Sequence, residues 1–383
     1  MVPDGSATND AGAEAALPPD EASGIDDAER YSRQVLFPGI GDKGQARLGR
    51  AHAAIVGCGA TGAAVAGLLA RAGVGTLTLI DRDFVEASNL QRQVLFDEAD
   101  ARASLPKAEA ARRHIARFNS GIAVRARVAD LTPSNIGELL DGAEIILDGT
   151  DNFETRYLLN DFAVERRRPW IYAAAIGAYA TTLNILPAGM AAGDGGAVVA
   201  PTCCLACLFP APPAGTVETC ETAGILSTAV NLAASIQATE ALKFLTGQAH
   251  RMRRTLLSFD LWEPAGGGGL ERSEISAGTP RAGCEVCERR IFTHLAGEGR
   301  AHVTLCGRGS VQIHEHHRPV DFAAMRRRLA AHPEIRELRA NDLLLRFRRG
   351  AHTITVFEDG RAIIQGTSDV VVARSLYARF VGA

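Results

Sequence analysis

The chain has 383 residues, of which 46% are hydrophobic and 5% aromatic, and its formal net charge at pH 7 is −3. A chain of this size and composition can form one large α/β domain and a smaller second one. It contains neither a run of about 18 apolar residues nor a signal peptide with a basic start and an apolar core, so we expect a cytoplasmic protein without a membrane span.

The first 28 residues are predicted to form a disordered acidic tail. The first 29 residues contain eight acidic side chains, no Lys or Arg, and no apolar periodicity. Without these eight, the chain has 41 basic and 36 acidic residues. The remainder is therefore mildly basic, which would suit an acidic partner, although a charge this small is usually only a solvated surface.

Apolar segments with strand and helix patterns alternate through the first half of the chain, which predicts a parallel sheet with helices on both faces. We expect strands at 53–57, 76–81, 122–128 and 143–151, and helices at 60–72, 107–119 and 133–140. Further on, we expect antiparallel strands within 170–187, a long helix over 224–247 and a hairpin around the glycines 266–269. The predicted fold class is α/β, a Rossmann-like doubly wound sheet with an antiparallel extension.

The pattern changes after about residue 295. Two arginine-rich helical segments surround short strands joined at turn signals, and from Glu288 onward there are 16 basic and 10 acidic residues. We therefore expect a large domain over 29–293, and a small basic α+β module over 300–383. Nucleic-acid binding is disfavoured for this module because its arginines are not interleaved with aromatic residues.

Four of the eight cysteines form two CxxC pairs, which are Cys204 with Cys207 and Cys284 with Cys287. Two such pairs commonly supply four thiolates to one tetrahedral Zn²⁺, and here the ion would connect distant segments. The spacing favours Cys204 over the adjacent Cys203. A redox CxxC or unrelated buried thiols are the alternative interpretations.

A glycine motif follows the first predicted strand. Gly57 would permit a tight turn, Gly59 would let backbone amides approach a phosphate, and Gly62 would let the helix pack on the strand. Asp81 follows Gly62 by 19 residues and could accept hydrogen bonds from ribose hydroxyls. This pattern suits any nucleotide, and a nicotinamide dehydrogenase would be the default interpretation.

Cationic and polar residues downstream favour a nucleoside triphosphate instead. Arg92 and Lys107 could stabilise reacting phosphoryl groups and a leaving pyrophosphate, and Asn89 adds a polar contact. Asp151 follows a strand at the sheet edge where ligands bind, and could hold Mg²⁺ against phosphate oxygens. Each residue alone could equally form a surface ion pair, but their joint occurrence in this order favours an ATP site.

The sequence resembles the ThiF/MoeB/HesA family, the bacterial relatives of ubiquitin-activating enzymes. The resemblance covers about residues 28–290 and rests on RYSRQVLFPGIG (30–41), VGCGATG (56–62), DRDFVEASNLQRQVLF (81–96), LPKAEAA (105–111), DGTDNFETR (148–156), CLACLFP (204–210), CETAG (220–224) and CEVC (284–287). It implies that the ATP-site residues are Arg33, Asp81, Asn89, Arg92, Lys107 and Asp151. It also implies a homodimer in which Arg33 reaches the partner subunit's site.

The reaction implied by the resemblance is adenylylation of a ubiquitin-fold sulfur-carrier protein that ends in Gly-Gly. The carrier's terminal carboxylate attacks the α-phosphate of Mg-ATP, pyrophosphate leaves, and a sulfur donor such as a sulfurtransferase or a cysteine desulfurase then displaces the adenylate. Thiamine, molybdopterin, cysteine and specialised sulfur metabolites all use such carriers. An ATP-dependent enzyme resembling the tRNA nucleoside dehydratases, and a non-catalytic interaction partner, remain as alternatives.

The sequence does not decide the roles of three further features. Cys220 lies in a polar segment before a helix start, where it is either a catalytic thiol or merely an exposed one. Cys306 invites comparison with a fused sulfurtransferase domain, but it lies too early in the module for such a nucleophile. His314, His316 and His317 could bind a metal, although alternating histidines on an edge strand are more often simply exposed.

Overall fold

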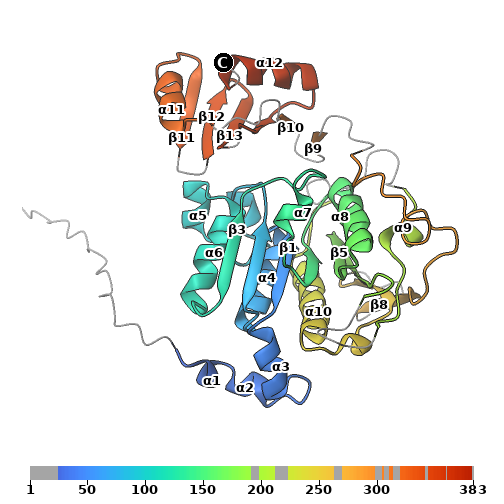
Figure 1. The fold of residues 1–383 in the computed structure, drawn as a ribbon. Helices are drawn as coiled ribbons and strands as arrows, with labels where there is room; N and C mark the ends of the chain where they lie inside the picture. Colours follow the sequence, from blue (N-terminus) through green and yellow to red (C-terminus); the bar gives the residue numbers. More distant parts are fainter. Residues whose placement is uncertain are drawn as a thin grey trace, which may run out of the picture.

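A computed structural model describes residues 25–190, 198–211, 223–262, 270–297, 304–305, 310–313, 320–340, 344–358 and 360–381. These residues form two β-sheets with flanking helices. The larger sheet lies in the middle of the molecule, and the smaller sheet lies beyond one end of its strands (Figure 1). Within the described residues, no helix is both long enough and apolar enough to cross a membrane.

The larger sheet has eight strands in the order β3-β2-β1-β4-β5-β6-β7-β8. The first five strands in this order pair in parallel, and β6, β7 and β8 continue the sheet in antiparallel fashion. Their bounds are β1 His52–Val56, β2 Thr76–Ile80, β3 Ala123–Arg127, β4 Ile145–Asp148, β5 Trp170–Ile176, β6 Tyr179–Ile185, β7 Thr255–Asp260 and β8 Glu271–Ser276. The strands β1 and β4 are buried along their whole length because helices cover both faces of the parallel part.

Two hydrophobic clusters occupy the two faces of this sheet. One cluster joins β1 and β2 to α4, α6 and α10, and the other joins β4 and β5 to α7, α8 and α9. The helices that precede the smaller sheet are α1 Asp27–Arg30, α2 Ser32–Val35, α3 Gly41–Leu48, α4 Ala60–Arg71, η1 Ala87–Asn89, α5 Glu98–Ala103, α6 Lys107–Phe118, α7 Ile136–Leu139, α8 Phe153–Arg166, α9 Leu205–Leu208, α10 Ser227–Leu245 and η2 Ala249–Arg251.

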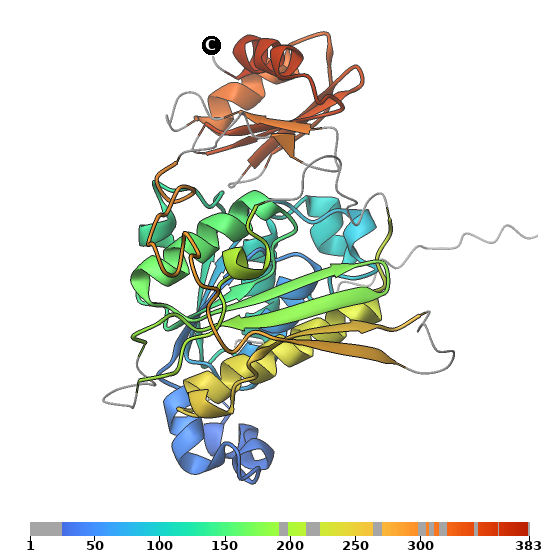
Figure 2. The same ribbon diagram turned by 90° about the vertical axis from the view of Figure 1, so that its right-hand side faces the viewer.

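The smaller sheet has six antiparallel strands in the order β11-β12-β13-β14-β10-β9. Its elements are β9 Thr304–Leu305, β10 Ser310–Ile313, α11 Phe322–Ala330, β11 Ile335–Ala340, β12 Leu344–Arg349, β13 His352–Phe357, β14 Ala362–Gln365 and α12 Val370–Phe380. Both helices share a core with one face of this sheet, and they lie on the side away from the larger sheet (Figure 2). We call the described residues from 304 onward the C-terminal module.

The predicted fold class is confirmed, and the element bounds differ from the expected ones by one to three residues. The long helix expected over 224–247, for example, is α10 Ser227–Leu245. The strand expected at 143–151 ends at Asp148, because the side chain of Asp148 accepts hydrogen bonds from the amide and hydroxyl of Thr150 and turns the chain. The helix expected from 133 begins at Ile136, after a turn closed by Asn135 Oδ1 on the amide of Thr132. Helix α1 begins at Asp27, and residues 1–24 of the expected tail lie outside the described residues.

Candidate nucleotide site and cysteine cluster

The glycine motif forms the turn between β1 and α4, and two of its glycines are required by close backbone contacts. Gly57 has a φ of +85°, and a Cβ there would lie 2.6 Å from the carbonyl oxygen of Gly149. A Cβ on Gly62 would lie 1.8 Å from the carbonyl oxygen of Gly57. Gly59 is different, because the atoms nearest to a Cβ there would be Gln93 Nε2 and the carbonyl oxygen of Gly149, both at 3.9 Å. The turn is therefore open at Gly59, where the sequence predicts phosphate contact.

Asp81 joins this turn to the end of β2. Its Oδ2 accepts a hydrogen bond from the amide of Cys58 at 2.6 Å, and its Oδ1 accepts one from the amide of Asp83 at 2.6 Å. Burial raises the pKa of this carboxyl, and nearby Lys107 opposes that shift. Asp81 thus fixes the glycine turn directly, in addition to the ribose contact that the sequence predicts.

Lys107 begins α6 and is held at both its backbone and its side chain by Asp83. The amide of Lys107 donates to the carbonyl oxygen of Asp83 at 2.8 Å, and its ammonium Nζ lies 3.2 Å from Asp83 Oδ2. The side chain of Lys107 is only 4% exposed, so its charge is largely withdrawn from solvent. Asp83 was not predicted from the sequence to be a site residue, although it lies two residues after Asp81 in the DRD motif (81–83).

The SNLQRQ segment forms the turn η1 and the residues after it. Asn89 is buried, and its Oδ1 accepts the amide of Glu86 while the Glu86 side chain caps Asn89 in return. Arg92 is partly exposed and donates to the carbonyl oxygen of Ser88 at 2.9 Å. Gln93 is 3% exposed, and its Oε1 has no hydrogen-bond partner among the described residues. This orphaned oxygen belongs to the side chain that faces Gly59, so a donor on a bound ligand would satisfy it.

Asp151 follows β4 and is exposed next to the start of α8. Its loop is fixed by Asp148, which is fully buried and lies 3.3 Å from the Nε of Arg156. Arg156 also donates to the carbonyl oxygen of Thr150 at 2.6 Å. Burial raises the pKa of Asp148, and the charge of Arg156 opposes the shift. Asp148 and Arg156 therefore hold the loop that carries Asp151, although only Asp151 was predicted from the sequence as a site residue.

The structure thus brings most of the predicted nucleotide-site residues together at the carboxyl ends of the parallel strands. Arg33 is the exception, because its helix α2 lies at the opposite end of the strands (Figure 1). The neighbouring Gln34 donates to the carbonyl oxygen of Ala72, at the C-terminal end of α4. Arg33 itself is exposed. Within one chain, Arg33 is therefore separated from the other predicted nucleotide-site residues, and the family resemblance assigns it to the partner subunit's site.

The four cysteines of the CxxC pairs form one cluster, as predicted, and we call them the cysteine cluster. Their sulfur atoms lie within 4.8 Å of one another, with 3.7 Å between Cys204 and Cys207 and 3.4 Å between Cys207 and Cys287. A tetrahedral Zn²⁺ with Zn–S bonds of about 2.3 Å separates its ligands by about 3.8 Å, whereas a disulfide would require about 2.05 Å. The spacing therefore fits four thiolates around one metal ion. Cys203 lies outside the cluster and donates to the carbonyl oxygen of Thr279.

Helix α8 attaches both halves of the cysteine cluster to the sheet. The Oδ1 of Asn160 accepts the amide of Leu205, which begins α9 between the first two cysteines. The Oδ2 of Asp161 accepts the amides of His294 and Leu295, which follow the second pair. Burial raises the pKa of Asp161 to about 6, although these two amides oppose the shift.

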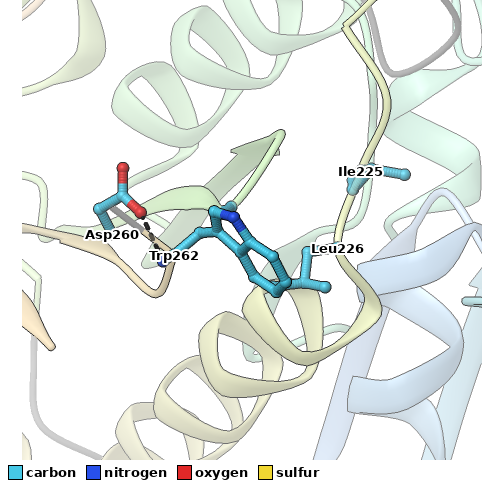
Figure 3. Close-up of a pocket in the computed structure, with 5 residues that line it drawn as sticks. Ile225, Leu226, Asp260 and Trp262 are labelled. Carbon is cyan, nitrogen blue, oxygen red and sulfur yellow. Dashed lines mark hydrogen bonds between the residues drawn. The ribbon is translucent and has the colours of Figure 1, made fainter. Parts of the chain in front are cut away.

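An open pocket of about 430 Å³ lies on the antiparallel side of the sheet (Figure 3). It is lined by Ala178, Ile225, Leu226, Asp260 and Trp262. Trp262 is 72% exposed, and its backbone amide donates to Asp260 Oδ1. The pocket shares no residue with the predicted nucleotide site.

Cys220, Cys306 and the histidines 314, 316 and 317 lie outside the described residues.

The fold and the site define a nucleotide-binding protein with a cysteine cluster. Residues 31–286 match the profile of the ThiF family, and the chain belongs to that family. It is 42% identical over 356 residues to the "Sulfur carrier protein ThiS adenylyltransferase" of Bacillus subtilis, covering 92% of this chain and 99% of that protein. It is 36% identical to the "Sulfur carrier protein adenylyltransferase" of Thermus thermophilus, covering 62% of this chain and 85% of the relative.

Solved structures agree on the fold. The structure titled "Crystal structure of E. coli MccB + ATP" superimposes with a TM-score of 0.54 at 24% identity, covering 67% of this chain and 74% of that one. At this level of identity the likeness concerns the fold alone. The resemblance to the ThiF family that the sequence motifs indicate is therefore confirmed by the family profile and by the two relatives.

Proposed function

We propose that this protein is an ATP-dependent adenylyltransferase that activates the C-terminal glycine of a ubiquitin-fold sulfur-carrier protein. The observation that carries this proposal is the match along almost the whole of both chains to the ThiS adenylyltransferase of Bacillus subtilis. A dehydratase of tRNA nucleosides and a non-catalytic partner are not favoured by that match. The proposal is tested by pyrophosphate exchange into ATP that depends on the carrier.

The chemistry of the candidate nucleotide site supports this reaction. We assign the triphosphate to the open glycine turn at Gly59, and the developing charge on the phosphates to Lys107 and Arg92. Asp151 offers a carboxylate at the carboxyl edge of the sheet, where it would hold Mg²⁺ against phosphate oxygens. The orphaned Oε1 of Gln93 would accept a hydrogen bond from the nucleotide. Positioning and charge stabilisation are the main requirements of such a phosphoryl-group reaction.

We further propose a twofold homodimer in which Arg33 completes the site of the partner subunit. Arg33 is exposed, and its helix lies at the end of the sheet opposite the nucleotide site of the same chain. It cannot act in that site without a large rearrangement. The residues after it, Leu36 and Phe37, are also exposed, with fractions of 71% and 62%. Large exposed apolar side chains next to a functional arginine are consistent with a subunit contact.

We assign one structural Zn²⁺ to the cysteine cluster. The donor set of four thiols and their sulfur separations support this assignment. Such an ion would join the segment at Cys204 to the segment at Cys284, two parts of the chain that each contact α8. Its contribution is to fold stability, because four protein ligands leave no position for a substrate.

We propose that the pocket at Trp262 receives an apolar part of the carrier protein. The pocket combines an exposed indole with aliphatic side chains, a composition that favours protein recognition. Ile225 lines the pocket and follows closely on the segment that carries Cys220 in the sequence. We assign Cys220 to a sulfur-transfer step that follows adenylate formation. A cytoplasmic sulfurtransferase or cysteine desulfurase would supply the sulfur.

Replacement of Cys220 by Ala is expected to separate the two halves of this reaction. We expect adenylate formation to stay within about twofold of wild type, because phosphoryl chemistry requires positioning and charge rather than a thiol. Formation of the carrier thiocarboxylate should fall. Mass spectrometry of the carrier, together with pyrophosphate exchange, measures both steps. Loss of exchange in a folded Cys220→Ala protein would show that Cys220 acts in the first step instead.

A further inference from the structure

The C-terminal module contacts the large sheet at the loop that follows β2. Phe84 of this loop is 2% exposed, and it forms a hydrophobic cluster with Leu344, Phe357 and Ile363 of the module. Val128, which follows β3, packs against the same cluster. The views of Figures 1 and 2 agree that the module lies over this edge of the sheet. The contact is therefore made at the carboxyl ends of the strands, where the candidate nucleotide site also lies.

Phe84 connects the module to Lys107 through the backbone. Phe84 forms an isolated antiparallel bridge with Pro106, and the amide of Val85 donates to the carbonyl oxygen of Leu105 at 2.8 Å. On the other side of Phe84, Asp83 holds the amide and the ammonium of Lys107. Burial of the Phe84 ring by the module thus fixes the short segment that determines where Lys107 lies.

Arg346 of the module acts on the same loop at a second point. Its guanidinium carbon lies 4.3 Å from the centre of the Phe84 ring, and its Nη2 lies 3.6 Å from the Oε1 of Glu86. Glu86 is the residue that caps η1 and exchanges hydrogen bonds with Asn89. The Arg346 side chain is only 22% exposed, so water screens this ion pair less than it screens a fully exposed one. One arginine therefore contacts both the Phe84 ring and the cap of the SNLQRQ turn.

A third contact reaches the same segment from β10. Gln312 Nε2 donates to Asp130 Oδ2 at 2.9 Å, and Asp130 Oδ1 accepts a hydrogen bond from Arg82 at 3.0 Å. Arg82 is the residue between Asp81 and Asp83, so its side chain is fixed in a pair that the module completes. All three contacts converge on residues 82–86, and none of them involves a residue that we assign to the nucleotide itself.

We propose that the C-terminal module is a positioning element for the adenylylation site and that Arg346 is its principal positioning residue. It acts through Phe84 and Glu86, which hold Lys107 and Asn89 in place for the triphosphate. This inference rests on the proposed function. It gives the module a role within the first reaction step, and it requires neither a thiol nor a metal in the module.

The test compares three full-length variants by carrier-dependent pyrophosphate exchange. Arg346→Ala removes the contacts to Phe84 and Glu86, and we expect the apparent KM for ATP to rise about tenfold while the KM for the carrier is unchanged. Arg346→Lys keeps a cation near both partners, and it should restore part of the ATP affinity. Arg348→Ala is the matched control, because Arg348 lies two residues further along β12, is exposed and pairs with Glu337. Its kinetics should be those of wild type.

The pattern of results separates positioning from simple loss of structure. A variant that merely unfolds in part lowers kcat through the amount of active protein and leaves the KM for ATP unchanged. Direct titration of ATP onto Arg346→Ala by calorimetry should show the same weakening without any carrier. The inference is overturned if Arg346→Ala retains the ATP affinity of wild type and of Arg348→Ala. Absence of exchange in the wild type would instead overturn the proposed function.

Discussion

Neither Arg33→Ala nor Asp151→Ala is expected to catalyse measurable exchange alone, yet an equal mixture of the two should recover about a quarter of the wild-type activity. After random subunit exchange, half of the dimers are mixed, and each mixed dimer has one complete site, so about a quarter of all sites should work. In the proposed homodimer, the complete site combines the Asp151 of one subunit with the Arg33 of the other. An arginine supplied in this way stabilises the charge of a reacting triphosphate, and its loss typically costs about 10³-fold or more.

The measurement is the exchange activity of the whole mixture, and a tag carried on one variant shows, by co-purification of the other variant, that mixed dimers are present. Arg50→Ala is a suitable control, because Arg50 is also exposed and follows α3 at the same end of the chain. It should keep wild-type activity alone. A mixture that remains inactive although mixed dimers are present would contradict a role for Arg33 across the subunit boundary.

Replacement of Cys284 by Ser is expected to release the metal and to lower the thermal unfolding temperature by about 10 °C or more. Structural zinc contributes directly to folding free energy, and in a chain of this size a loss of several kcal/mol corresponds to a shift of about that size. Elemental analysis and a thermal melt are the two measurements. They should give about one zinc per wild-type chain and little in the variant.

Cys203→Ser provides the matched control for this experiment. Cys203 adjoins the cysteine cluster and donates to the carbonyl oxygen of Thr279, a hydrogen bond that a serine hydroxyl can retain. It should keep the zinc and most of the stability. A stable wild type that contains no metal, or equal zinc in both variants, would contradict the assignment.

Parts of the fold and site could be predicted where the local geometry requires a particular residue type or spacing, which is visible in the sequence. Gly57 and Gly62 were predictable because a Cβ at either position would collide with backbone. The cysteine cluster was predictable because CxxC spacing brings two sulfurs together whatever the intervening fold. Asp81 was predicted as a ligand residue. Its structural task, to fix the glycine turn through the amide of Cys58, depends on a contact between neighbouring strands.

The remaining site residues depend on contacts that no local pattern specifies. Asp148 and Arg156 pair across the loop that carries Asp151, and each residue alone has the composition of an ordinary strand end or helix surface. The burial of Phe84 is set by residues of the C-terminal module, which are far away in the chain. Arg33 was predicted from the family resemblance to act across a boundary, and its distance from its own site became visible only with the fold.

The central claim is tested most directly by exchange of radiolabelled pyrophosphate into ATP. The wild-type protein should catalyse this exchange with Mg²⁺ and a ubiquitin-fold carrier that ends in Gly-Gly, because the acyl-adenylate forms reversibly. The same carrier without its terminal glycine should support none, since the attacking carboxylate is then out of reach. Lys107→Ala should lower the exchange by at least about tenfold, because the buried cation that we assign to the triphosphate is lost. Exchange that proceeds equally well without a carrier, or no exchange with any Gly-Gly carrier tested, would contradict the proposed function.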